Sequence, residues 1–154
     1  MPLEFHPYIT RTKDVASDGH CGFRAIAALL GFGENAWARV RRDLLEELTN
    51  FEEEYKVIFV ETEAVNQMKY RLNCFEETAF SSHWMDMPEM GYLVASRYNV
   101  AVVSLSPTAC FTLLPLRTAV VEPPKCICIG FVNQNHFIQV RQLNNRQRLI
   151  CILL

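Results

Sequence analysis

The pattern of apolar residues changes once along this chain of 154 residues, near Val100. Before that point apolar residues recur at helical spacing, as in residues 37–48, where Trp37, Val40 and Leu44 would share one helix face. After it, short runs rich in β-branched residues alternate with turn residues, which is the pattern of strands. Helices followed by strands are typical of an α+β domain. We therefore expect helices packed on a central, mostly antiparallel β-sheet.

The expected elements cover most of the chain. Prolines and weak periodicity predict an irregular lead-in over residues 1–17. Charged residues of mixed sign in the second helix, Arg41 among them, are expected on its solvated face. The expected helices cover 21–30, 37–48, one or two stretches within 51–77, and 86–99 with Asp86 at its start; the expected strands cover 100–105, 110–116, 126–132, 136–140 and 148–154.

Length and composition do not by themselves indicate a function, so we expect the function to lie in a localised site. The length fits a single domain over residues 1–154. Half of the residues are hydrophobic and the formal net charge is −2, so nothing in the totals indicates a nucleic-acid binder. Six cysteines without the paired spacings of a secreted scaffold, and no signal peptide, predict reduced thiols in the cytoplasm or nucleus. No apolar run is long enough to span a bilayer.

Residues 18–24 (DGHCGFR) place Cys21 at the start of a predicted helix. Unpaired N–H groups and the helix dipole favour a thiolate there, so the pKa of Cys21 is expected to fall. Gly19 and Gly22 leave room for a substrate carbonyl near backbone N–H donors, and Asp18 is expected to cap the helix or hold the turn. Cys21 is therefore a candidate nucleophile. The alternative is a buried structural cysteine at an ordinary loop-to-helix junction.

His136 is the candidate base. It begins a predicted strand directly after a tight turn, where its ring would face a site at the rim of the sheet. A nucleophilic cysteine needs a base within hydrogen-bond reach, and the fold brings the two together from distant positions. The alternative is a histidine that only satisfies local structure.

Metal binding is not expected. Cys126 and Cys128 lie two apart, so they share one face of a strand and would pack as small hydrophobic residues. Cys74 and His83 would be the further ligands, but none of these spacings is that of a zinc site. No phosphate-binding loop is present either, so we expect no metal and no cofactor.

Three stretches resemble one known family. Residues 18–24 resemble the D-G-x-C-x-[FY]-R signature of ovarian-tumour (OTU) domain cysteine proteases. Residues 130–137 (GFVNQNHF) are similar to the strand, turn and histidine–aromatic pair that carry the base in that family, and residues 87–100 to its acid-led helix running into a central strand. The resemblance spans about residues 14–140. The sequence of residues 84–103 is most similar to OTU domains of plant and transposon-related proteins.

The resemblance implies a papain-like OTU fold and a deubiquitinase. Such an enzyme hydrolyses the bond after the C-terminal glycine of ubiquitin or a ubiquitin-like modifier. Cys21 would attack and form a thioester, His136 would act as general base, and Asp18 would order the loop whose N–H groups stabilise the oxyanion. The expected partners are ubiquitin, polyubiquitin chains or a ubiquitin-like modifier, with no nucleic acid and no membrane, and we expect a monomer.

One position departs from the family pattern. Many members carry Asn or Asp two residues after the histidine, but this chain has Ile138, which cannot orient an imidazole. Asp14, Asn133 and Asn135 are the candidate replacements, and we predict that one of them lies within hydrogen-bond reach of a His136 ring nitrogen. Otherwise the enzyme would work as a dyad, or its activity would be weakened.

Two other functions stay open from the sequence. One is a catalytically weak or inactive OTU-fold module that binds ubiquitin or another partner. The other is a papain-like acyltransferase or peptidase that does not act on ubiquitin. Acidic residues within 52–63 are expected to face a basic surface of the partner.

Overall fold

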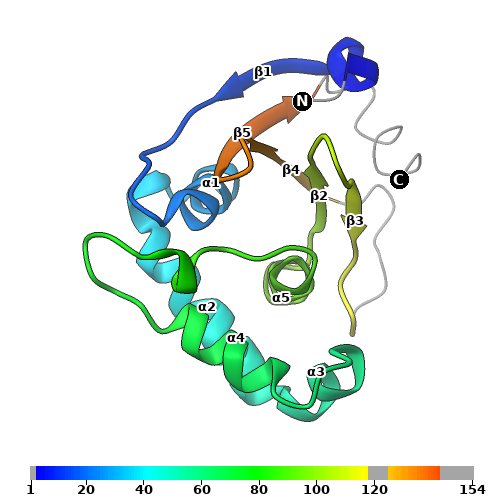
Figure 1. Cartoon of the computed structure of the whole chain (residues 1–154). Coiled ribbons are helices and arrows are strands. Elements are labelled where there is room, and N and C mark those ends of the chain that lie inside the picture. The colour runs from blue at the N-terminus through cyan, green and yellow to red at the C-terminus, as the bar shows by residue number, and fades with distance from the viewer. Residues whose placement is uncertain (1–2, 118–124, 143–154) are drawn as a thin grey trace.

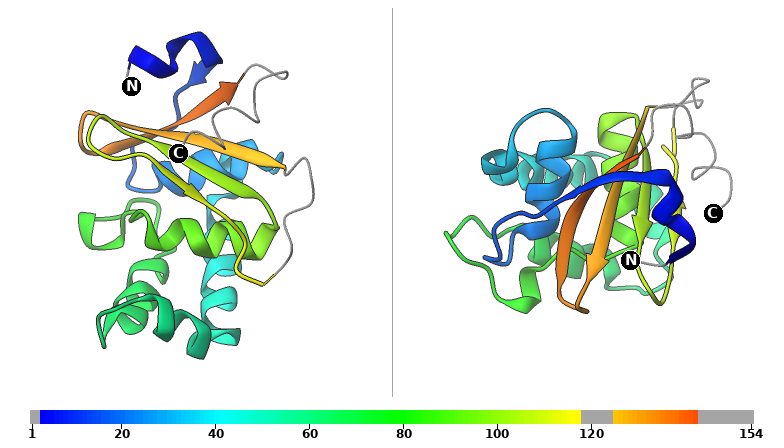
Figure 2. Two further views of the ribbon diagram at one scale, coloured as in Figure 1. Left: turned by 90° about the vertical axis from the view of Figure 1, so that its right-hand side faces the viewer. Right: turned by 90° about the horizontal axis from the view of Figure 1, so that it is seen from above.

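The computed structural model describes residues 3–117 and 125–142. Over these ranges one β-sheet carries helices gathered on one of its faces (Figure 1; Figure 2), which confirms the α+β prediction. The helices are α1 (Cys21–Leu29), α2 (Trp37–Asn50), α3 (Glu52–Ile58), α4 (Ala64–Leu72) and α5 (Glu89–Tyr98), with short 3-10 turns η1 (Leu3–Tyr8), η2 (Glu34–Ala36) and η3 (Ser81–His83). The strands are β1 (Ile9–Lys13), β2 (Ala101–Leu105), β3 (Phe111–Leu113), β4 (Cys126–Val132) and β5 (His136–Gln142).

The sheet is mixed and mostly antiparallel. Its strand order is β1-β5-β4-β2-β3, and only the β2–β4 pair is parallel. A tight hairpin joins β4 to β5, with Val132 paired to His136. Asn133 and Gln134 both have positive φ in its turn, at 53° and 60°, as the right-handed twist of hairpin strands favours. This turn places His136 at the rim of the sheet.

The two faces of the sheet bury different side chains. On the helix-covered face, Val102, Ile129 and Phe137 join one core with the apolar stripes of the helices. On the opposite face, Val103 and Cys128 belong to a second, smaller cluster. This alternation follows from the two-residue period of a strand. The first core holds α1, and therefore Cys21, against β5.

Two expectations about element boundaries are wrong, and one is untested. Residues 9–13 are not irregular: they form β1, which pairs antiparallel with β5. Their side chains are mostly exposed, so the strand has no apolar alternation that a sequence pattern would reveal. Helix α5 begins at Glu89 after Pro88, not at Asp86. The strand expected over 148–154 lies outside the described residues.

In the ranges that the structure describes, no helix is both long enough and apolar enough to cross a bilayer.

A buried carboxylate joins α2 to α3 and to the segment after β3. The Glu47 side chain is only 3% exposed and accepts a hydrogen bond of 2.9 Å from the Tyr55 hydroxyl. The same carboxylate oxygen pairs with Arg117, whose guanidinium lies over the Phe51 ring. Burial, together with this carboxylate, raises the pKa of Tyr55 to about 12. Glu47 is therefore a structural acid.

Replacing Glu47 should cost more stability than replacing its neighbour Glu46. Glu47→Ala leaves a buried phenol without its acceptor, so we expect the free energy of unfolding to fall by about 2 kcal/mol. Glu46 is largely exposed and pairs with Arg97 at the surface, so Glu46→Ala should cost about 0.5 kcal/mol or less. Urea unfolding of both variants measures the difference, and equal losses would contradict the assignment.

Candidate active site

The turn before α1 is held by Asp18. Its carboxylate accepts hydrogen bonds from the Arg24 guanidinium at 2.6 to 3.2 Å and from the His20 N–H at 3.0 Å. Burial raises the pKa of Asp18, but these hydrogen bonds outweigh it, so the pKa lies below its ordinary value and the group stays ionised. Asp18 is not the helix cap, because that position belongs to His20, which makes no side-chain capping bond. Asp18 instead fixes the turn that presents Cys21.

The loop between α4 and α5 packs against this turn. The Ala79 N–H donates to the Asp18 carbonyl at 2.8 Å, and the Trp84 indole N–H donates to the Ala79 carbonyl at 3.1 Å. Gly19 has φ +87°, and a Cβ there would overlap the Ala79 carbonyl oxygen. Only glycine therefore allows the two loops to approach this closely.

Cys21 is buried at the first turn of α1. Its side chain lies inside the first core, 8% exposed, and the Phe137 N–H donates to its Sγ at 3.4 Å. Burial raises the pKa of the thiol, and the N–H groups of Phe137 and Gly22 lower it by less. The expected fall in pKa is therefore wrong. The helix terminus favours a thiolate, but here it lies in the protein interior, where loss of water disfavours the charge more strongly.

His136 meets Asp14 at the rim of the sheet. Its Nε2 lies 2.7 Å from Asp14 Oδ1, and its Nδ1 lies 3.4 Å from the Ser17 hydroxyl. Asp14 also accepts the Val15 N–H at 2.8 Å. The hydrogen bond from His136 is the largest of the influences that hold the pKa of Asp14 below its ordinary value. Of the three replacements considered for Ile138, the structure brings Asp14 to the ring.

The other two candidates lie on the hairpin turn before His136. Asn133 and Asn135 are exposed on the hairpin turn, and no hydrogen bond from either side chain to His136 is found among the described residues. Within the same ranges no hydrogen bond joins Cys21 Sγ directly to the imidazole. Sequence reasoning missed Ser17, because a single serine in an exposed segment carries no distinguishing pattern.

Arg41 is fully buried, so its expected place on a solvated helix face is wrong. Its Nε donates to His20 Nδ1 at 3.1 Å, and its other nitrogens donate to the carbonyls of Arg71 and His83, both at 2.9 Å. Because His20 Nδ1 accepts, its Nε2 carries the proton and donates to the Glu76 carbonyl at 2.9 Å. Burial lowers the pKa of His20, in keeping with a neutral ring.

The described cysteines outside the site lie in different parts of the fold. Cys126 and Cys128 belong to the smaller cluster on the other face of the sheet, whereas Cys74 follows α4. In residues 3–117 and 125–142, no group of three or more His, Cys, Asp or Glu side chains is arranged to hold a metal ion.

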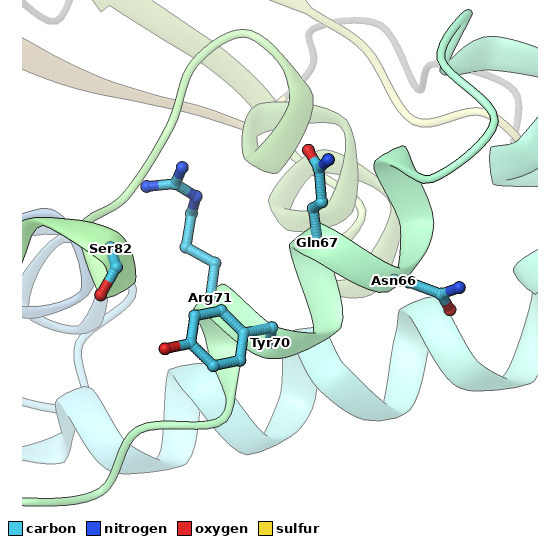
Figure 3. Close-up of a pocket in the computed structure, with 5 residues that line it drawn as sticks. All are labelled: Asn66, Gln67, Tyr70, Arg71 and Ser82. Carbon is cyan, nitrogen blue, oxygen red and sulfur yellow. The ribbon is translucent and has the colours of Figure 1, made fainter.

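A surface cavity lies along α4, away from these residues. It has a volume of about 380 Å³ and is open to solvent (Figure 3). None of its lining residues belongs to the Cys21–His136 region. They are Asn66, Gln67, Tyr70, Arg71 and Ser82.

Similarity to known proteins is found in the structure and not in the sequence. No protein-family model matches the sequence, and none of the curated proteins does. Among solved structures, the viral OTU domain protease of Qalyub virus has a TM-score of 0.64 at 12% identity, covering 90% of this chain and 87% of its own. The OTU domain of OTUD1 has 0.61 at 12%, covering 84% of each chain. The Hazara virus OTU, solved bound to ubiquitin, has 0.57 at 14%, covering 89% and 83%.

These similarities extend over most of both chains, but the identities are too low to carry an activity across. They do not resolve a subgroup, so the similarity to plant and transposon-related domains stays a prediction. What they show is the architecture: this chain has the fold of OTU domain proteases.

Proposed function

We propose that this chain is a deubiquitinase, a cysteine isopeptidase that cleaves after the C-terminal glycine of ubiquitin or a ubiquitin-like modifier. The observation that carries the proposal is that β5 brings His136, which contacts Asp14, beside the start of α1, where Cys21 Sγ accepts the N–H of the next residue, Phe137. The OTU fold supports it, as does the ubiquitin bound to the Hazara virus OTU. The choice of modifier and linkage depends on contact surfaces outside these residues.

In this proposal the two nitrogens of His136 have different tasks. Asp14 occupies Nε2, so we assign the thiol proton to Nδ1, which in the resting structure lies 3.4 Å from the Ser17 hydroxyl. Sγ then forms a bond to the substrate carbonyl carbon, and the protonated imidazole returns its proton to the leaving lysine amine as the C–N bond breaks. Water activated by the same ring hydrolyses the thioester. Asp14 holds the ring and stabilises the imidazolium that forms in between.

The start of α1 supplies donors for the oxyanion. The N–H groups of Cys21 and Gly22 belong to the first turn, where an α-helix has no internal acceptors for them. Asp18 fixes the preceding turn, and this supports its proposed role in positioning these donors.

A catalytically weak binding module is the second candidate. It is favoured by the burial of Cys21, which keeps the thiol protonated, and by the absence of a direct Cys21–His136 hydrogen bond in the described residues. Such a protein would bind the modifier without turnover.

The acidic surface contributes less to partner binding than its composition implies. Glu52 pairs with Lys56 and Lys69, and Glu54 pairs with Arg117, so these charges are largely satisfied inside the chain. Acidic residues within 52–63 are therefore proposed to make only a minor contribution to association with a basic surface of the partner.

Reaction with a ubiquitin probe carrying a C-terminal electrophile tests the main proposal. We expect the wild-type chain to form a covalent adduct at Cys21 and to cleave ubiquitin chains, and Cys21→Ala to do neither while still binding ubiquitin. Cys74→Ala is the matched control, because Cys74 is also buried but lies outside the site. Binding without adduct or cleavage would establish the weak module, and cleavage only of unrelated peptides in a substrate panel would establish a different peptidase.

Loss of Asp14 should slow turnover without unfolding the domain. Asp14→Ala is expected to lower turnover between about 10-fold and about 10⁴-fold, because the imidazole loses its orienting carboxylate. Asn135→Ala, on the exposed turn beside His136, should leave turnover unchanged. Full activity of Asp14→Ala would show that Cys21 and His136 work as a dyad.

A methyl group at Gly19 should disturb the turn over residues 18–20 that presents Cys21, which we call the nucleophile turn. Gly19 and Gly31 share a φ of +87°, but a Cβ at Gly31 meets nothing within 4 Å, whereas one at Gly19 overlaps Ala79. Gly19→Ala is expected to lower turnover by about 100-fold through misplacement of Cys21. Gly31→Ala introduces only backbone strain, which should lower stability by about 1 kcal/mol, and turnover should be retained. Similar turnover in both variants would remove the steric argument.

A further inference from the structure

Arg41 is a buried cation that the proposed reaction does not use. Its residue is 0% exposed, and no salt bridge to a carboxylate is found for it in the described ranges. Burial lowers the pKa of Arg41 to about 10, so the side chain remains charged at neutral pH. A buried charge without an ionic partner is costly and needs compensating contacts. Its contacts therefore identify what it does.

The compensating acceptors come from two parts of the chain: the turn before α1, and the stretch from the end of α4 to the start of α5. One is His20, the residue directly before the nucleophile. The others are the Arg71 carbonyl in the last turn of α4, where carbonyls lack internal donors and a cation is favoured, and the His83 carbonyl before α5. The guanidinium also lies 3.8 Å from the centre of the Phe23 ring, two residues after Cys21. Arg41 thus contacts the chain on both sides of Cys21.

The turn before Cys21 also contacts the segment between α4 and α5 directly. His20 donates to the Glu76 carbonyl, its ring stacks on Trp37 at 3.6 Å, and Ala79 donates to Asp18. Displacing the guanidinium would therefore loosen His20 and the 76–79 segment together. Lysine cannot substitute, because one ammonium group does not reproduce a planar fork that serves three separate acceptors.

We propose that Arg41 is a positioning residue for the nucleophile: it acts through His20 to hold the Cys21 turn closed and the thiol buried. This inference rests on the proposed function for its importance to turnover, but not for its effect on Cys21. Burial is the largest influence on the pKa of the thiol, ahead of the N–H groups of Phe137 and Gly22. Position, and not charge, is therefore the contribution that we assign.

Alkylation of Cys21 by iodoacetamide, followed by mass spectrometry across a range of pH, tests this without any ubiquitin assay. In Arg41→Lys the turn opens, the thiol gains water and its pKa falls toward the ordinary value. We expect alkylation at neutral pH to accelerate by about three- to tenfold for each unit of that fall, since thiolate fraction rises while nucleophilicity declines. Turnover, where measured, should fall by about 10- to 100-fold, mainly in kcat.

The control is Arg42→Lys, the same change at the next position of α2, where the side chain is exposed. It should match the wild-type pH profile. The charged and titratable groups around the thiol and Arg41 are unchanged in both variants; they are Asp14, Asp18, His20, Arg24, Cys74 and His136. If Arg41→Lys and Arg42→Lys give the same profile, the proposal is overturned.

A second variant tests the route through His20. His20→Asn cuts the link to Arg41 while leaving the bonds of Arg41 to the Arg71 and His83 carbonyls possible. It should accelerate alkylation as Arg41→Lys does, and the double variant should not exceed the larger single effect, because both changes break one connection. Additive effects would show that Arg41 does not act through His20. If Arg41→Lys fails to fold, His20→Asn decides alone: a wild-type profile overturns the proposal.

Discussion

The buried guanidinium of Arg41 ties together parts of the protein that are far apart in sequence. It links the middle of α2 to the residue before Cys21, to the end of α4 and to the segment before α5. Hydrophobic burial is non-directional and would accept small sliding motions between these elements. Hydrogen bonds from a rigid fork define their relative position. The core supplies most of the stability, and this one polar contact set supplies much of the geometry at the nucleophile turn.

Cys21 shows how burial and helix polarity compete at one atom. Unpaired N–H groups at the start of α1 and the N–H of Phe137 favour a negative charge on Sγ. Loss of water disfavours that charge by more, so the resting thiol is protonated. Because only 8% of the residue is exposed, little water remains around Sγ to stabilise a negative charge. A buried, protonated thiol of this kind is protected from adventitious oxidation or alkylation.

The architecture was largely predictable from the sequence, because helix and strand periods are local properties. The strands around Val103 and Ile129 and the helix after Cys21 follow from apolar spacing. Strand β1 could not be predicted from apolar spacing, because a strand at the sheet edge with exposed side chains is specified by its partner and not by its own pattern. The residues proposed for catalysis were named from motif and resemblance, but which of them meet was decided by tertiary pairing.

Arg41 shows where residue type and position disagree. Its spacing from Trp37, Leu44 and Leu48 puts it on the apolar stripe of α2, while its charge suggests the opposite face. Spacing was the better guide, because carbonyl groups and a neutral imidazole were available inside to accept its donors. The raised pKa of Cys21 was unpredictable for a related reason: the depth of a helix terminus depends on what packs over it.

Asp14 directly follows β1, whose pairing with β5 brings the carboxylate beside His136. Four of the five residues of that strand are exposed, so backbone pairing contributes most of its attachment to the sheet. Edge strands of this kind open at a lower free energy than the core unfolds. When β1 detaches, the core, α1 and Cys21 remain in place while His136 loses its carboxylate. Thermal melting would not detect such an opening, so in this protein global stability and the pairing of Asp14 with His136 are separable quantities.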